Sequence, residues 1–276
     1  MMFITFQALG HHGRLGNQLF QIAATLGAAR VHQCDFVLPP WKYSGYFEYA
    51  LPQSEKIEVQ YVYMEPDFAY RPIPVNGNTS ISGNFQSERY FAHCQEELRH
   101  YLTPNSKLAG MVRELKDRYL ADIPAEKACS VSVRRGDYIG HSCFAELVAT
   151  QYYHNALSQI GKDQVKVVFS DDINWCREFF ARREFESHRF VFVEPSHELA
   201  DLFLIAACTN HILANSSYSW WGAWLDPNPE KMVFVPDAWF AGQYINRNKT
   251  FMERGYHDIQ DLCPASWHRI PVTHQD

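Results

Sequence analysis

The amino-acid sequence predicts an α/β protein with parallel, doubly wound sheets. From Cys129 onward, short apolar runs alternate with stretches of helical periodicity, and the last such run is Met232–Val235. This alternation is typical of successive βαβ units. The N-terminus shows the same order, because the apolar run Met1–Leu9 is followed by a glycine-containing loop and then by apolar residues at helical spacing from Leu19 to Ala29.

The elements of the second half are the clearest. Between Val31 and Asp122 the pattern is less regular and rich in proline, with helical spacing near Leu98 and at Leu108–Leu120. The tail from Asp237 is irregular and aromatic, and we expect it to wrap back over a surface. The expected strands are Cys129–Val133, Val165–Phe169, Phe190–Val193, Ile212–Ala214 and Met232–Val235, and the expected helices lie around Tyr152–Ile160, Trp175–Arg183, Leu199–Cys208 and Trp220–Leu225.

Two domains are expected. A chain of 276 residues, of which 46% are apolar, has enough length for two modest cores. The stretch Ala121–Ala125 is polar, contains Pro124 and lies between a helix and a strand, which favours a hinge. We therefore place the domains at residues 1–123 and 124–276.

Composition excludes several classes of protein. A net charge of −6 disfavours nucleic acid as a partner. No apolar run approaches the roughly 18–20 residues of a membrane span, and the N-terminus lacks the pattern of a secretory signal. Seven widely spaced cysteines without a C-x-x-C pair indicate a reduced, cytoplasmic chain without structural zinc. Peripheral association with a membrane stays open.

Polar clusters follow the first four strands of the second half. Ligands of open parallel sheets bind outside the carboxyl ends of the strands, so these clusters are expected to face one site. They are Arg134-Arg135-Gly136-Asp137, Ser170-Asp171-Asp172, Glu194, and Asn215-Ser216-Ser217-Tyr218-Ser219.

The arginine pair indicates a diphosphate site. Two guanidinium groups at a strand end suit bidentate bonds to phosphate, although Asp137 could instead make this a surface salt-bridge loop. Residues 215–219 precede a helix, where hydroxyl and N–H groups favour an anion, and the alternative is a plain serine N-cap. The presence of both features on one sheet edge favours phosphate.

Asp171 and Asp172 are poor ligands for a metal ion, because neighbouring carboxylates point in different directions and a hard cation needs several oxygens. We expect no metal. One carboxylate could accept paired N–H donors from guanine while the other caps the following helix, and capping alone is the alternative for both.

The first loop, Gly10–Asn17, matches neither the dinucleotide fingerprint nor a P-loop. A turn that only packs a helix is the alternative. The histidines show no ligand-like spacing, and His12, within this loop, is the one to test.

Several segments together resemble one family. Gly13–Gln21 resembles the G-x-x-G-N-Q signature of α1,2-fucosyltransferases, glycosyltransferase family 11, and Val131–Tyr138 resembles its H-x-R-R-G-D-Y motif. The resemblance extends from the first loop to about Trp239. Further matches are Phe169–Asp172 with Trp175, Gly83–Phe91, and Cys208 and His211 followed by Ala214–Trp224, which is close to A-N-S-S-F-S-W-W-G-A-W.

The resemblance implies a GT-B-like fold, with two Rossmann-type domains facing a central cleft. It implies an inverting, metal-independent galactoside α1,2-fucosyltransferase that moves L-fucose from GDP-β-L-fucose to the 2-hydroxyl of a terminal β-galactoside, without a cofactor. Its partners would be GDP-fucose and a galactose-terminated glycan. Residues 1–123 would take the acceptor and residues 124–276 the GDP-sugar.

The same resemblance implies roles for individual residues. Arg134 would stabilise the departing GDP, Asn17 would reach the reacting fucose, and Asp137 or His12 would be the base. Ser132 stands where the motif has histidine, so a contact to nucleotide or phosphate is missing or replaced. The expected substrate-binding residues are Arg14, Gly16, Arg135, Asp171, Asp172, Asn215, Ser216, Ser217, Tyr218 and Ser219.

Two other functions are compatible with the sequence. One is a noncatalytic sugar-nucleotide or glycan-binding protein. The other is a related transferase with a different nucleotide-sugar donor.

Overall fold

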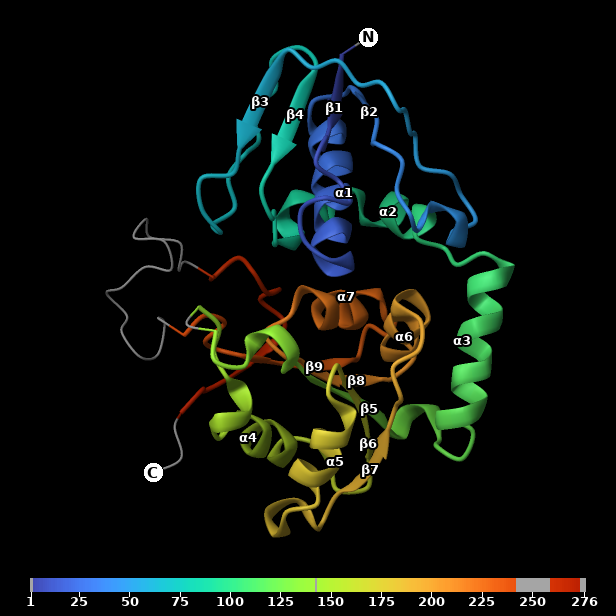
Figure 1. Cartoon of the computed structure of the whole chain (residues 1–276), viewed down its shortest axis with the longest axis vertical. Coiled ribbons are helices and arrows are strands. Elements are labelled where there is room, and N and C mark those ends of the chain that lie inside the picture. The colour runs from blue at the N-terminus through green and yellow to red at the C-terminus, as the bar shows by residue number, and fades with distance from the viewer. Residues whose placement is uncertain (1, 142, 242–258, 274–276) are drawn as a thin grey trace. The chain divides into compact units, whose positions relative to one another are not determined.

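The structure, a computed structural model, describes residues 2–141, 143–241 and 259–273 and forms two compact units (Figure 1). Unit 1 comprises Met1–Ala109 and Asp258–Pro264, and unit 2 comprises Gly110–His257 and Ala265–Asp276. Among the described residues, no helix is long and apolar enough to cross a membrane.

The division of the chain differs from the boundary expected after Ile123. It falls within helix α3 (Ser106–Tyr119), so the proline-containing stretch belongs to unit 2. Ile123 is 8% exposed there, and the stretch connects α3 to the first strand of the unit. A polar, proline-containing sequence marks a loop, but such a loop can also lie within a domain.

Unit 1 is built on a four-stranded parallel sheet in the order β2-β1-β4-β3. The long helix α1 (Leu15–Val31) is buried along most of its length because it is rich in alanine and leucine. The other elements are β1 (Phe3–Thr5), β2 (Asp35–Phe36), β3 (Tyr61–Met64), β4 (Thr79–Ser82), α2 (Gln95–Tyr101), and the 3-10 turns η1 (Ser44–Tyr46), η2 (Glu88–Tyr90) and η3 (Ala92–Cys94).

Unit 2 contains a six-stranded sheet, also parallel, in the order β10-β9-β8-β5-β6-β7. Figure 1 shows α4 and α5 on one face of this sheet and α6 and α7 on the other. The strands are β5 (Ala128–Val133), β6 (Val165–Ser170), β7 (Arg189–Phe192), β8 (Asn210–Ile212), β9 (Met232–Pro236) and β10 (His268–Ile270). The helices are α4 (Tyr152–Ser158), α5 (Ile173–Phe180), α6 (Glu198–Ile205) and α7 (Ser217–Leu225), with 3-10 turns η4 (Ala125–Lys127), η5 (Gly136–Tyr138), η6 (Leu147–Ala149) and η7 (Arg183–Phe185).

The predicted fold class is confirmed, since both sheets are parallel and helices cover both faces of the larger one. The tail adds two features that the sequence did not predict. Strand β10 pairs with β9, and Asp261 belongs to unit 1, where it accepts a hydrogen bond from Tyr70 N (3.0 Å) and pairs with Arg89 (2.7 Å). Residues 242–258 of the predicted wrapping tail lie outside the described residues.

Candidate active site

The carboxyl edge of the unit 2 sheet brings together the polar clusters that follow β5, β6 and β8. Strand β5 lies between β8 and β6, so the three loops after these strands are neighbours. Parallel strands place their carboxyl ends at the same edge. Ten of the predicted site residues meet there: Arg134, Arg135, Asp137, Asp171, Asp172, Asn215, Ser216, Ser217, Tyr218 and Ser219.

Both arginines are held in place by carboxylates. Arg134 pairs with Asp137, and its Nη1 lies 2.7 Å from Asp171 Oδ2. Arg135 donates through Nε to Asp172 Oδ2 at 3.1 Å, and its guanidinium carbon lies 3.6 Å from the centre of the Trp175 ring.

These contacts leave part of each guanidinium accessible. The arginine side chains are only 19% and 13% exposed, so they are held close to the sheet. A guanidinium has five N–H donors. Among the described residues, the Nη groups of Arg135 make no hydrogen bond, which leaves their N–H donors for an anion.

The two aspartates support the arginine loop. Asp172 caps α5, because its Oδ1 accepts a hydrogen bond from Trp175 N (3.3 Å), as expected for one of the pair. Asp171 contacts both arginines: Oδ1 accepts a hydrogen bond from Arg135 N (2.9 Å), and Oδ2 pairs with Arg134. The guanine contact expected of one of the two aspartates stays a prediction. A Cβ on Gly136 would lie 2.3 Å from Asp171 Oδ2, so this glycine makes room for the aspartate.

The loop between β8 and α7 is held by its own buried side chains. Asn215 is 1% exposed, and its amide donates to Ala145 O (3.0 Å) and Trp239 O (2.8 Å). The buried Ser219 hydroxyl bonds to Ala214 O and Ser216 O, at 3.2 and 3.0 Å. These two side chains thus hold the loop, and the phosphate contact expected of them stays a prediction.

Ser216, Ser217 and Tyr218 form the half-buried start of α7. Ser216 caps the helix, because its Oγ accepts a hydrogen bond from Tyr218 N at 3.3 Å. Tyr138 donates its hydroxyl to Asn215 O (3.0 Å), which joins the arginine loop to this helix start. The N–H groups of a helix start favour anions, so this position suits a phosphate beside the arginines.

Three buried polar side chains of unit 2 form a hydrogen-bonded series. The Ser130 hydroxyl donates to His211 Nδ1 (2.8 Å), and His211 Nε2 donates to Asp226 Oδ2 (3.1 Å). Burial lowers the pKa of His211, while Asp226 opposes this shift. This Ser-His-Asp series resembles a catalytic triad, but Ser130, His211 and Asp226 are 0%, 0% and 4% exposed. A substrate therefore has no access to the three side chains, and their role is structural.

Ser132, which replaces the motif histidine, is 6% exposed within β5. Its Oγ has no hydrogen-bond partner among the described residues. Tyr153 donates its hydroxyl to the Ser132 carbonyl at 2.8 Å. The Ser132 hydroxyl therefore makes no hydrogen bond to the arginine loop, and the loss or replacement of an imidazole contact to the nucleotide stays a prediction.

The predicted first loop lies in unit 1 and is fixed by glutamines of α1. Gln18 donates to Gly13 O (3.0 Å), and Gln21 donates to His12 O (2.9 Å). Trp41 Nε1 donates a hydrogen bond to Gln18 Oε1 at 2.9 Å. These contacts explain why glutamines follow the glycines in the motif, a role that the sequence analysis did not identify.

Asn17 lies in the first turn of α1, where Gln86 Nε2 donates to its Oδ1 at 2.9 Å. Gly13 has a φ of +78°, and a Cβ on it would lie 2.5 Å from Asn17 Nδ2, so both its backbone and its contact require glycine. His12 and Arg14 are exposed, and Gly16 is buried in α1. These four predicted residues, Asn17, His12, Arg14 and Gly16, thus form a group in unit 1, separate in the chain from the unit 2 group.

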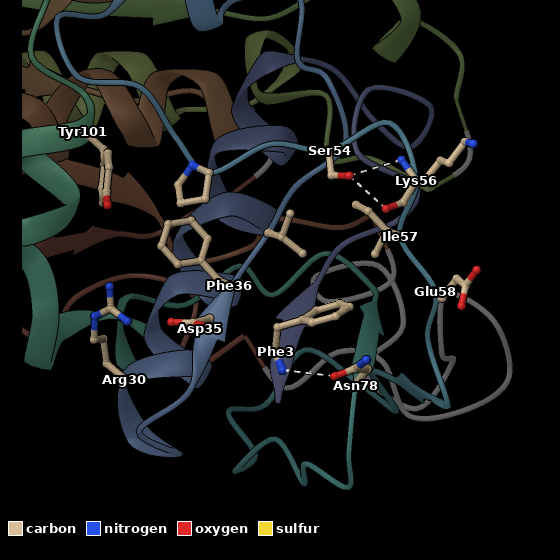
Figure 2. Close-up of a pocket in the computed structure, with 12 residues that line it drawn as sticks. Phe3, Arg30, Asp35, Phe36, Ser54, Lys56, Ile57, Glu58, Asn78 and Tyr101 are labelled. Atoms are coloured by element: carbon tan, nitrogen blue, oxygen red, sulfur yellow. Dashed lines mark hydrogen bonds between the residues drawn. The ribbon is translucent and has the colours of Figure 1, made fainter. Parts of the chain in front are cut away.

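A hollow of about 780 Å³ also opens on unit 1 (Figure 2). It lies at the amino ends of the strands, where Phe3 N donates to Asn78 Oδ1 at 3.3 Å. Arg30 on its wall is paired with Glu97 at 2.5 Å, and Phe36 is 4% exposed. Because ligand sites of parallel sheets lie at the carboxyl ends of the strands, this hollow is not the candidate active site.

No group of three or more His, Cys, Asp or Glu among the described residues has the arrangement of a metal site. Asp137, Asp171 and Asp172 are paired with Arg134 and Arg135.

The sequence matches the family model "Glycosyl transferase family 11" over residues 35–259. An α1,2-colitosyltransferase of Escherichia coli is 32% identical over 203 residues, which cover 71% of this chain and 64% of the relative. The glycosyltransferase WbnK of O-antigen biosynthesis in Escherichia coli is 39% identical over 132 residues, covering 45% of this chain and 42% of the relative. The chain thus matches less than two thirds of the length of either relative.

A third relative, the galactoside 2-α-L-fucosyltransferase SEC1 of Bos taurus, is 24% identical over 273 residues, covering 84% of this chain and 71% of the relative. Among solved structures, the fucosyltransferase NodZ from Bradyrhizobium has a TM-score of 0.51 at 12% identity, covering 82% of this chain and 94% of NodZ. At this identity the similarity concerns the fold, which is GT-B-like, as expected. Because the family model matches most of its length, the chain belongs to glycosyltransferase family 11.

Proposed function

We propose that this protein is an inverting, metal-independent fucosyltransferase. It transfers L-fucose from GDP-β-L-fucose to the 2-hydroxyl of a terminal β-galactoside and forms an α1,2 linkage. The observation that carries the proposal is the arginine pair held beside the start of α7 at the carboxyl edge of the unit 2 sheet. Family membership and the similarity to a bovine galactoside 2-α-L-fucosyltransferase support the transferred sugar, the linkage and the acceptor.

The first part of the mechanism is the departure of GDP. When the glycosidic bond breaks, negative charge grows on the diphosphate, and Arg134 and Arg135 stabilise it. The carboxylates of Asp171 and Asp172 already hold these guanidinium groups in place, so little reorganisation is needed. The start of α7 adds the positive end of a helix dipole, and the side chains of Asn215 and Ser219 hold the loop that precedes it.

The second part is attack by the acceptor hydroxyl on the opposite face of the sugar. Asn17 positions the reacting fucose, because an amide is too weak a base to take the proton. Asp137 and His12 are the proposed bases, and their side chains are exposed. Asp137→Asn and His12→Ala, each assayed for transfer, will decide between them.

A different donor is the second candidate function, because the similarity to an α1,2-colitosyltransferase at 32% identity points to a related transfer. In the test, purified protein is incubated with GDP-fucose or with a colitosyl donor, each with and without a β-galactoside. GDP release and the linkage of the product are measured. Acceptor-dependent release from GDP-fucose with an α1,2 product supports the first proposal. Release from the colitosyl donor alone supports the second, and binding without turnover identifies a noncatalytic protein.

A further inference from the structure

Asn17 depends on a second amide for its orientation. An asparagine amide has an accepting end and a donating end, and it presents the wrong one if it rotates by half a turn. Gln86 Nε2 donates to Asn17 Oδ1 at 2.9 Å, which selects one of the two orientations and directs Nδ2 to the Gly13 side. Gln86 is only 8% exposed, so water competes little for this bond.

The loop that carries Gln86 has an unusual backbone, and a carboxylate stabilises it. Phe85 has a positive φ of 50°, which is uncommon for a bulky residue. Glu65 accepts hydrogen bonds from Asn84 N (2.6 Å) and Phe85 N (3.0 Å). A Cβ on Gly83 would lie 2.4 Å from Glu65 Cβ, so glycine is needed for this close approach. Burial raises the pKa of Glu65 to about 7.

The same loop is locked against the helix that carries Asn17. Gly27 of α1 lies close to the segment that follows Gln86, because a Cβ on Gly27 would be 1.9 Å from Tyr90 O. His93 Nε2 donates to Gly27 O at 3.1 Å. Ser87 caps η2, because its Oγ accepts a hydrogen bond from Arg89 N at 3.3 Å. Gln86 and Asn17 are therefore parts of one rigid assembly within unit 1.

We propose that Gln86 is a positioning residue, which holds the Asn17 amide in the orientation required for sugar transfer and is itself placed by the Glu65-stabilised loop. The inference rests on the proposed function, because it assigns Asn17 to the reacting sugar. Gln86 acts through Asn17, so its removal should slow transfer without weakening the nucleotide site in unit 2.

The test compares Gln86→Leu, which removes the donor, with Gln86→Glu, which keeps the size but offers a carboxylate that favours the opposite amide orientation. Gln53→Leu is the matched control, because Gln53 makes one exposed hydrogen bond to Ser44 (2.6 Å). We expect kcat to fall by about 100-fold in both Gln86 variants. GDP affinity should stay within about twofold of wild type, and the control should match wild type.

A double-mutant cycle with Asn17→Ala separates positioning from general stabilisation. In the Asn17→Ala background, Gln86→Leu should cause no further loss of kcat. An unchanged kcat in Gln86→Leu, or a full additional loss in the double variant, overturns the proposal, as does failure of both Gln86 variants to fold. If wild type transfers no fucose from GDP-fucose, the proposed function fails instead, and this is seen before any variant is compared.

Discussion

Arg134→Lys tests the phosphate role most directly. The arginine uses two nitrogens for two carboxylates, with Nη1 on Asp171 at 2.7 Å and Nη2 on Asp137. A lysine ammonium is a single point charge and cannot span both carboxylates while it also binds a diphosphate. The substitution therefore keeps the charge and removes the planar geometry.

The structure predicts different magnitudes for stability and for catalysis. The side chains of Arg134, Asp171 and Asp137 are 19%, 25% and 51% exposed, so solvent screens these pairs and the free energy of unfolding should fall by about 1 kcal/mol or less. For a chain of this size that corresponds to roughly 2–4 °C in Tm. Loss of a charge contact to the transition state costs on the order of 100-fold in kcat.

The assay is acceptor-dependent GDP release at saturating donor, with thermal unfolding measured on the same samples. Arg30→Lys is the matched control, because Arg30 is ion-paired with Glu97 at 2.5 Å in unit 1, outside the proposed site. We expect the control to retain full turnover. Near wild-type kcat in Arg134→Lys, with normal folding, would refute the phosphate role and leave the salt-bridge interpretation of the loop.

Four further predictions concern other parts of the molecule. Asn17→Ala should keep its affinity for GDP and lose most of its kcat, and equal losses in titration calorimetry and kinetics would assign the first loop to the nucleotide pocket. EDTA should leave the rate unchanged, whereas a loss that magnesium or manganese restores would exclude the metal-free mechanism. Gly27→Ala should lower the free energy of unfolding by at least about 1–3 kcal/mol in urea titrations, because the added Cβ would lie 1.9 Å from Tyr90 O, and an unchanged midpoint would contradict this packing. Burial lowers the pKa of His211, so the stability that this residue contributes is present above the pKa of the unfolded state, about 6.5, and is lost as pH falls. The difference in free energy of unfolding between wild type and His211→Gln should therefore shrink between pH ~7.5 and ~5.5. A constant difference would show that the protonation of His211 does not change on unfolding.

Periodicity predicted five of the six strands described in unit 2; β10 was not predicted, and the expected Ile212–Ala214 overlaps β8 only at Ile212. Strand β5 is buried at every position although Ser130 and Ser132 lie within it, and the expected Cys129–Val133 differs from it by one residue. The strands of unit 1 carry less signal. Strand β2 has two residues, and β3 is an edge strand in which Val62 is 60% exposed, so neither shows the alternation of a half-buried strand.

The sequence by itself determined the α/β class, most strands of unit 2 and the chemical types of the residues at the site, because hydrophobic periodicity is a local property of the sequence. Only the tertiary structure decided which of these residues contact one another. The pairing of Arg134 with Asp171 requires β5 and β6 to be neighbours, and the bond from Gln86 to Asn17 joins residues 69 positions apart. Such partners depend on strand order and on the direction of each side chain, which arise only when distant segments pack together.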